Sequence, residues 1–180
     1  MPHSLPLLRW AALLLVWLLI GGCYPRDVDP PANNREGYVP VYQSLAAVQN
    51  VQVLTAQPLR QTGKIYIKDG FLFVVEPNKG IHVINNRDPE KPVAQAFISV
   101  PGVYDVAIKD STLYANNTMD LVAFNVARPS RIELVKRVAN AFALPQYPPF
   151  TNVYFECADP AKGVVVSWVR ASLTNPNCYR

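Results

Sequence analysis

The middle of this chain repeats itself, and this repetition constrains the fold more than any other feature. The tripeptide Ile-Lys-Asp at 67–69 recurs at 108–110, and Asn85 recurs as Asn125. An interval of about 40 residues is within the range of known repeat architectures. The interval shortens by one position within the turn-like segment 76–79, where losing a residue leaves the register of the neighbouring strands intact. The two copies are therefore predicted to be two equivalent structural units.

Each unit contains four short segments rich in β-branched and aromatic residues, separated by glycine, proline or turn-forming residues. This composition favours strands over helices, and Asp69-Gly70 is a strong hairpin signal. Four strands in about 40 residues is typical of a β-propeller blade. The predicted fold is all-β, with propeller-like four-stranded repeats at about 63–102 and 103–142. The predicted strands are 64–68, 71–75, 81–85 and 93–100 in the first unit, and 103–108, 112–115, 121–126 and 132–138 in the second.

The segments that flank the two units are too irregular to complete further blades. Ser44 is a suitable N-cap for a short helix over 45–49. In the tail, 143–180, we expect a closing hairpin formed by 153–156 and 164–169. Because propellers usually close with at least four blades, we expect a short stack or small, incomplete propeller. Its unpaired edges would then be covered by the flanking segments or by a second copy in a homodimer.

Several segments resemble a known bacterial repeat. Residues 80–89 (Gly-Ile-His-Val-Ile-Asn-Asn-Arg-Asp-Pro) and 97–102 (Phe-Ile-Ser-Val-Pro-Gly) resemble the LVIVD repeat of exported propeller-like proteins. Residues 120–126 resemble the motif that names the repeat, with Asn125 where an aspartate is expected. The whole layout is similar to short LVIVD-repeat lipoproteins of the Bacteroidota type. This resemblance implies a fold and a location, and it carries over no catalytic residue.

The amino-terminal segment has the features of an export signal. Arg9 precedes an apolar run over 10–20, which is too short to cross a bilayer of roughly 30 Å as a helix. We therefore interpret 1–22 as a cleaved signal peptide. The next residues, Ile-Gly-Gly-Cys at 20–23, resemble the lipobox of bacterial lipoproteins. In that family the cysteine, here Cys23, becomes a diacylglyceryl cysteine and its new amine is usually acylated as well, for instance with palmitate.

The resemblance to lipoproteins also predicts where the protein is held. Several acyl chains on Cys23 would exceed the roughly two signals that stable membrane anchoring requires. Tyr24, rather than an aspartate, follows Cys23, and by the same resemblance this favours the outer membrane of the cell envelope over the inner one. Whether the domain faces the periplasm or the exterior stays open. Residues 24–37 are rich in proline, charge and asparagine, so we expect a flexible tether and a single ordered domain over 38–180.

Two further cysteines remain in the exported domain, Cys157 and Cys178. An even number of cysteines in an oxidising compartment predicts a disulfide between them. Two buried free thiols are the alternative.

The charge and motifs of the chain point away from nucleic acids and cofactors. The formal net charge is +4, and because no dense basic run occurs, we expect no nucleic-acid partner. The sequence contains no phosphate-binding loop, dinucleotide motif or zinc-protease motif, so no cofactor and no metal are predicted.

A catalytic site is not predicted either. His82 lies between apolar neighbours in an alternating strand, where we expect it to face solvent or a loop in a structural role. No nucleophile elbow accompanies it. Asp69 and Asp110 occupy equivalent positions and are interpreted as turn formers.

Two hypotheses for function follow. We favour a membrane-anchored, non-catalytic module that binds an unknown partner or organises an envelope complex. The main alternative is a glycan- or small-ligand-binding lipoprotein associated with a transport or degradation system, and an unrecognised hydrolase is a more distant one. Aromatic residues that could face a ligand, with packing as the alternative role, are Tyr147, Phe150, Tyr154, Trp168 and Tyr179.

Overall fold

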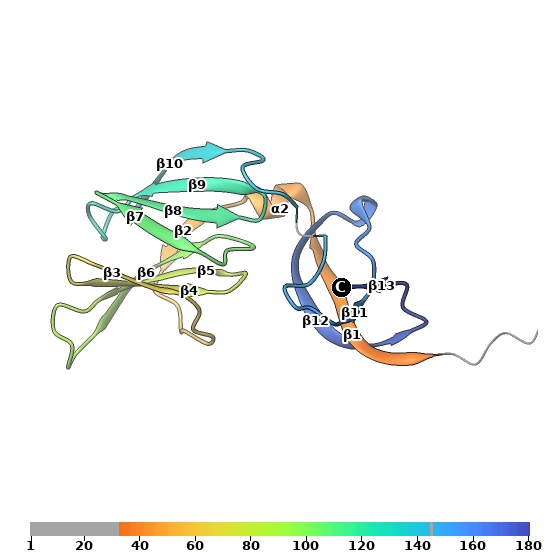
Figure 1. Cartoon of the computed structure of the whole chain (residues 1–180). Helices are drawn as coiled ribbons and strands as arrows, with labels where there is room; N and C mark the ends of the chain where they lie inside the picture. Colours follow the sequence, from red (N-terminus) through yellow and green to blue (C-terminus); the bar gives the residue numbers. More distant parts are fainter. Residues whose placement is uncertain (1–32, 145) are drawn as a thin grey trace, which may run out of the picture. The chain divides into compact units, whose positions relative to one another are not determined.

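The computed structural model describes residues 33–144 and 146–180; the predicted signal peptide, Cys23 and most of the predicted tether lie outside these ranges. Strands dominate the described chain and are grouped into three open sheets (Figure 1). The all-β fold class is thus confirmed.

Two of the sheets are antiparallel and contain the predicted units. We name them sheet B, with the order β2-β6-β5-β4-β3, and sheet C, with the order β10-β9-β8-β7. All eight predicted strands are present, and their ends lie within three residues of the predicted ones. Sheet B consists of β2 (Gln52–Thr55), β3 (Ile65–Lys68), β4 (Phe71–Glu76), β5 (Gly80–Asn85) and β6 (Val93–Ser99). Sheet C consists of β7 (Val106–Lys109), β8 (Thr112–Asn117), β9 (Asp120–Asn125) and β10 (Glu133–Val138).

The two sheets share local details at the interval seen in the sequence. The Asn85 side chain accepts a hydrogen bond from the Arg87 amide at 3.1 Å, and Asn125 accepts one from the Ala127 amide at 3.0 Å. Each bond joins residues two positions apart at the start of the loop between the third and fourth strands of its unit. The fourth strand of each unit also has an irregularity in its register with the third strand, at corresponding positions.

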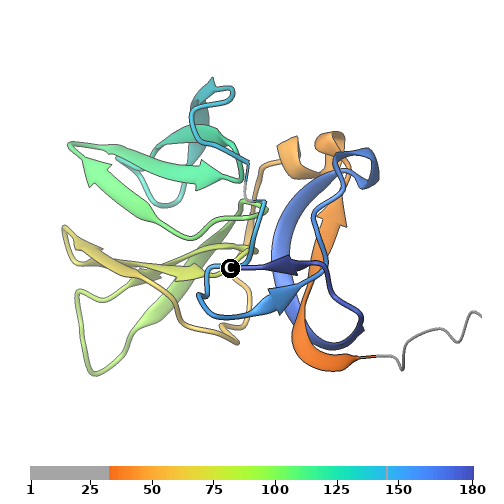
Figure 2. The ribbon, with the colours of Figure 1, turned by 45° about the vertical axis from the view of Figure 1, so that its right-hand side comes forward.

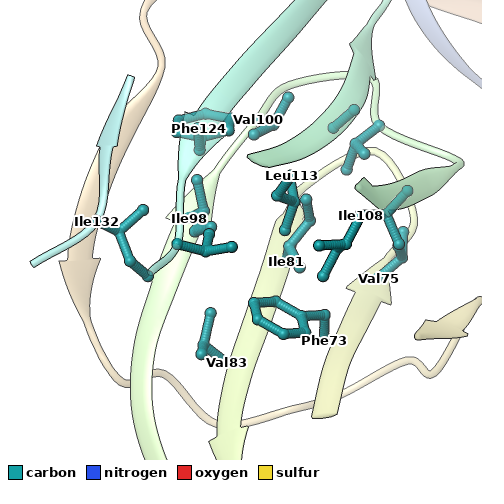
Figure 3. Close-up of a cluster of buried hydrophobic side chains, with 14 of the residues drawn as sticks. Phe73, Val75, Ile81, Val83, Ile98, Val100, Ile108, Leu113, Phe124 and Ile132 are labelled. Carbon is teal, nitrogen blue, oxygen red and sulfur yellow. The ribbon is translucent and has the colours of Figure 1, made fainter. Parts of the chain in front are cut away.

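Sheets B and C pack face to face around one shared hydrophobic core. Figure 3 shows side chains from the two sheets, such as Ile81 and Ile98 from sheet B and Leu113 and Phe124 from sheet C, gathered in this core. These four side chains are 0% exposed. The β-branched residues that predicted the strands therefore also fill the interior between the sheets.

The third sheet, sheet A, joins the two ends of the described chain. Its order is β12-β1-β11-β13, and its strands are β1 (Asn34–Gln43), β11 (Tyr154–Phe155), β12 (Val164–Thr174) and β13 (Cys178–Tyr179). Figure 2 shows β1 lying alongside β12. The predicted hairpin between 153–156 and 164–169 is wrong, because β1 lies between β11 and β12 and pairs with both.

Strand β1 also begins earlier than the predicted domain boundary. Asn34, inside the predicted tether, is already paired with Thr174 of β12. A side chain at Gly37 would collide with Leu173 and with the backbone of Tyr154, so glycine permits the close approach of the neighbouring strands. The polar composition of 34–37 resembles a linker, yet β12 satisfies its backbone hydrogen bonds.

Helix α2 (Leu45–Gln49) lies where the sequence predicts it. The Ser44 hydroxyl accepts a hydrogen bond from the Ala47 amide at 3.2 Å, which confirms the predicted N-cap. Val48 is 1% exposed and packs with Val164 and Val166 of β12. The Val48 side chain therefore packs the helix against strand β12 of sheet A.

The disulfide between Cys157 and Cys178 is present, with the two Cα atoms 5.4 Å apart. It links the end of β11 to β13, which are short paired strands. The predicted bond is thus confirmed, and it joins the carboxyl-terminal residues to the β11 end of sheet A rather than to the expected hairpin.

Candidate functional site

Two mainly apolar hollows, of 460 Å³ and 710 Å³, share Val165 of β12 in their walls, and we refer to them together as the cleft. We name them the sheet C hollow and the disulfide hollow. The sheet C hollow is lined by residues that include Tyr104, Ala107, Tyr114, Leu121, Phe142 and Val166. The disulfide hollow is lined by residues that include Leu45, Met119, Leu144, Tyr147, Phe155, Cys157, Val164 and Cys178.

The cleft has the size and chemistry of a site for a small apolar ligand. Pockets of roughly 300–1,000 Å³ with mainly apolar and aromatic walls are typical of such sites. Polar side chains form a minority of the walls: they include Asp105, Asn116 and Thr118 in the sheet C hollow, and Gln146 and Asp159 in the disulfide hollow. The Tyr104 hydroxyl is protonated at neutral pH, because its ordinary pKa is 10.0 and burial raises that pKa further. It is therefore able to donate a hydrogen bond.

One of the five predicted aromatic residues lines this cleft. Tyr147 is 51% exposed in the disulfide hollow, and the Arg180 guanidinium lies 4.0 Å from the centre of its ring. The same guanidinium donates a hydrogen bond to the carbonyl of Pro148 at 2.8 Å. The carboxyl-terminal residue thus holds this wall of the cleft in place.

The other four aromatic residues pack elsewhere on sheet A. Phe150 stacks on Tyr38, with ring centres 4.9 Å apart. Tyr154 packs on Tyr179 at 4.9 Å, and Trp168 packs edge-on against Phe155 at 5.5 Å. Because Tyr154 and Phe155 are consecutive in β11, their side chains point to opposite faces of the sheet. The predicted aromatics therefore do not share one ligand-binding face, and mutual packing is the main role that their contacts indicate.

Most of the cleft-lining residues were not predicted from the sequence. Tyr104, Phe142 and Leu144 lie in connecting segments, whereas Val165 lies in β12. No motif links these residues, because sheet A and sheet C bring them together only in the folded chain. The exposed apolar pair Phe142 and Leu144, between sheet C and the proline-rich segment, is the one signal that could have marked this site.

A second, more polar hollow lies beside His82. Contrary to the prediction, His82 does not face solvent: it is 3% exposed and packs on Phe97 at 4.7 Å. Its Nε2 lies 2.9 Å from the Glu76 carboxylate, to which Lys79 donates a hydrogen bond at 2.7 Å. The adjacent hollow of 410 Å³ is lined by residues that include Gln57, Arg60, Glu76, Asn78 and Lys79.

Glu76 gives this cluster a pH-dependent contribution to stability. Burial alone would raise the pKa of the Glu76 carboxyl, but hydrogen bonds from Lys79 and His82 outweigh burial and hold that pKa below its ordinary value of 4.5. A lowered pKa means that the ionised carboxylate stabilises the folded state above pH 4.5. That stabilisation is lost as the pH falls through the lowered pKa.

We therefore expect the Glu76→Gln variant to lose less stability in acid than the wild type. Urea unfolding of both proteins at several pH values between about 6 and 3 measures this difference. The Lys64 side chain lowers the pKa of Asp105. Because this ion pair is exposed and therefore weak, Asp105 should add only a small pH dependence to the stability of both proteins. Equal pH dependence in the two proteins would contradict the assigned role of Glu76.

Neither a metal site nor a membrane-spanning helix is present among the described residues. Within 33–144 and 146–180, no three His, Cys, Asp or Glu side chains are grouped as a metal site would require. In the same part of the chain, no helix has the length and apolar character needed to span a membrane.

Comparisons of the sequence and structure with known proteins were made at three levels. Protein-family models, curated proteins and solved structures all gave no match.

Proposed function

We propose that this chain is an exported lipoprotein of the cell envelope, held in the outer membrane by acyl chains on Cys23, whose β domain is a non-catalytic binding module. The lipobox-like residues 20–23 and Tyr24 support the anchor and its location. The polar stretch between Cys23 and Asn33 would then connect the anchor to sheet A. His82 is buried and its Nε2 lies 2.9 Å from the Glu76 carboxylate, which supports a structural rather than a catalytic role for this histidine.

We further propose that sheets B and C are two propeller-like repeats of the LVIVD type. Three observations support this interpretation: the regular interval between the two copies, the equivalent loop hydrogen bonds of Asn85 and Asn125, and the matching register irregularities. Sheet A is then an addition built from both flanks of the repeats rather than a third blade.

The apolar cleft is the binding site in this proposal, and it is the observation that carries the function. Its walls offer extensive apolar surface and few hydrogen-bonding groups, so an apolar small molecule or lipid fragment fits better than a sugar. Sugars require several polar partners when they are buried, because unpaired hydroxyl groups are costly.

Two equally exposed leucines allow a direct test of this site. Leu144 lines the cleft and is 45% exposed, whereas Leu134 lies on β10 outside it and is 44% exposed. An environment-sensitive apolar dye, anilinonaphthalene sulfonate, is titrated into the domain 33–180 and its two Leu→Gln variants. Losing about 1 kcal/mol of apolar contact should weaken dye binding about fivefold for Leu144→Gln. Leu134→Gln should bind as the wild type does; equal effects of the two substitutions would contradict the cleft as the site.

The polar hollow supports a second candidate, the binding of a glycan or another small polar ligand. Among the described residues, the Asn78 side-chain oxygen is buried without a hydrogen-bond partner, and Asn78 lines this hollow beside Lys79 and Arg60. Because that oxygen is not accessible to solvent, a ligand would instead contact the Lys79 and Arg60 side chains that line the hollow. Thermal unfolding in the presence of a panel of saccharides tests this candidate, since a ligand that binds only the folded state raises the melting temperature.

A further inference from the structure

Sheet B has a second face, on the side away from the core, that carries large apolar residues in contact with solvent. We name Ile65, Ile67, Leu72 and Ile84 the outer face of sheet B. Ile65 is 51% exposed and Ile67 is 69% exposed. Ile67 is paired with Leu72, and Leu72 with Ile84, so the three side chains form a continuous row across β3, β4 and β5.

The corresponding face of sheet C is buried within this same molecule. The repeat relates each residue of the outer face to a counterpart in the second copy, and these counterparts pair with one another in the same pattern. They are Val106 (1% exposed), Ile108 (7%), Leu113 (0%) and Phe124 (0%). All four belong to the core that sheet C forms with sheet B. The outer face of sheet B is thus the equivalent of an interface already formed once in this chain.

The face of sheet C that points away from sheet B has more polar residues than the outer face of sheet B. The inner face of sheet B uses Phe71, Phe73 and Val75 for the core, whereas the equivalent positions in sheet C are Thr112, Tyr114 and Asn116. Part of that face of sheet C also borders the sheet C hollow, together with Val165 and Val166 of β12. Polar substitution of this kind is typical of a terminal repeat that faces solvent. The outer face of sheet B has kept its apolar residues instead.

Charges do not oppose contact between two copies of the outer face. On this side of sheet B, the Glu76 carboxylate is paired with Lys79 and with the buried His82. The loop that leads into β3 contributes Gln57 and Arg60 to the hollow at Glu76, away from the row formed by Ile67, Leu72 and Ile84. A neutral apolar patch therefore remains.

We propose that the outer face of sheet B packs against the same face of a second copy of this chain, forming a two-fold symmetric dimer. A self-complementary patch gives such an isologous contact, the commonest arrangement in soluble oligomers. A head-to-tail stack would instead place this face on the side of sheet C that carries Thr112, Tyr114 and Asn116, where Val165 and Val166 of β12 border the same hollow. Like the contact between sheets B and C, this contact would join two apolar sheet faces, but here the two faces are identical. It would remove the exposed isoleucines from water.

The test is chemical cross-linking of the full chain in its own membranes. If Cys23 is acylated and the other two cysteines are bonded, the wild type has no free thiol, so a bis-maleimide reagent reacts only with an introduced cysteine. The variants are Ile65→Cys and Ile67→Cys on the outer face, and Val135→Cys on β10 as the control. Val135 is 54% exposed and lies on the edge of sheet C, where edge-to-edge pairing would occur instead.

We expect Ile65→Cys and Ile67→Cys to give a cross-linked species of twice the chain mass and Val135→Cys to stay monomeric. Adding Leu72→Lys to the Ile67→Cys variant should reduce cross-linking at least tenfold, while the Cys157–Cys178 bond, assayed separately, reports an intact fold. Absence of the dimer from both outer-face variants would overturn the proposal. So would cross-linking of Val135→Cys alone, which indicates edge pairing, or a product that contains a different protein.

Discussion

Substituting Cys23→Ser will abolish membrane attachment of the mature protein. A serine hydroxyl is a much weaker nucleophile than a cysteine thiolate, so residue 23 will no longer accept the diacylglyceryl group. Stable anchoring depends on about two lipid signals, and in our proposal all of the acyl chains are carried by Cys23. The variant should accumulate as an unprocessed precursor or a soluble species in fractionated cells, whereas the wild type should fractionate with the outer membrane.

A matched control separates loss of the anchor from general misfolding. The Cys157→Ser variant breaks the disulfide but leaves Cys23 unchanged, so any of it that escapes degradation should stay in the membrane fraction. If Cys23→Ser still appears as a mature-sized membrane protein, the lipobox interpretation is wrong.

Removing the disulfide should have the largest effect on stability. Cys178→Ala removes a covalent link across a sequence separation of 21 and should lower the free energy of unfolding by roughly 2–4 kcal/mol. For a domain of this size that corresponds to a fall in melting temperature of roughly 4–16 °C. The effect should be large because β11 and β13 are short: they pair through Tyr154–Tyr179 and Phe155–Cys178, and the adjoining Val153 and Arg180 add two backbone hydrogen bonds. Thermal and urea unfolding of domain 33–180 measure the change.

The double variant Cys157→Ala/Cys178→Ala is the control for the unpaired thiol. It should be about as stable as Cys178→Ala, because both lack the same cross-link. Free-thiol labelling of the unfolded, non-reduced wild-type domain should detect no thiol. Stoichiometric labelling of both cysteines, or a Cys178→Ala domain as stable as the wild type, would contradict the stabilising role of the bond.

Loss of the disulfide should also alter the cleft. Both cysteines line the disulfide hollow, and Arg180 contacts Tyr147 on its wall. The bond therefore connects the stability of the carboxyl-terminal residues to the shape of the proposed binding site.

The strands of sheets B and C could be predicted because their pattern is local. Each pairs with a neighbour close in sequence, and the turns have distinctive residues: Asp69 and Gly70 adopt positive φ angles of 50° and 78° between β3 and β4. Helix α2 was predictable for a similar reason, since the Ser44 side chain caps it through the nearby Ala47 amide. Short-range hydrogen bonds of this kind are encoded in adjacent residues.

Sheet A could not be predicted in the same way, because its pairing is long-range. Asn34 and Thr174 pair across almost the whole domain, and a local pattern does not reveal such a partner. The short β11 then pairs with β1 instead of β12, and so the expected hairpin does not form. The burial of His82 was missed for a related reason: its environment is made by Glu76 and Phe97 on neighbouring strands.

Most of the cleft could not be predicted from the sequence because its walls combine these two kinds of structure. Tyr114 comes from a predictable strand of sheet C, whereas Val165 comes from β12 of sheet A. The aromatic residues singled out in the tail were recognised as exposed candidates, but their ring-to-ring contacts depend on the pairing within sheet A.

Mass spectrometry of the amino-terminal tryptic peptide of the membrane-purified protein tests the central claim most directly. Trypsin cleaves after Arg26, so the mature lipoprotein should yield the peptide Cys23-Tyr24-Pro25-Arg26 with a diacylglyceryl group on the thiol and an acyl chain on the amine. A peptide that runs from Trp10 to Arg26, or one that begins elsewhere and carries an unmodified Cys23, would contradict the account.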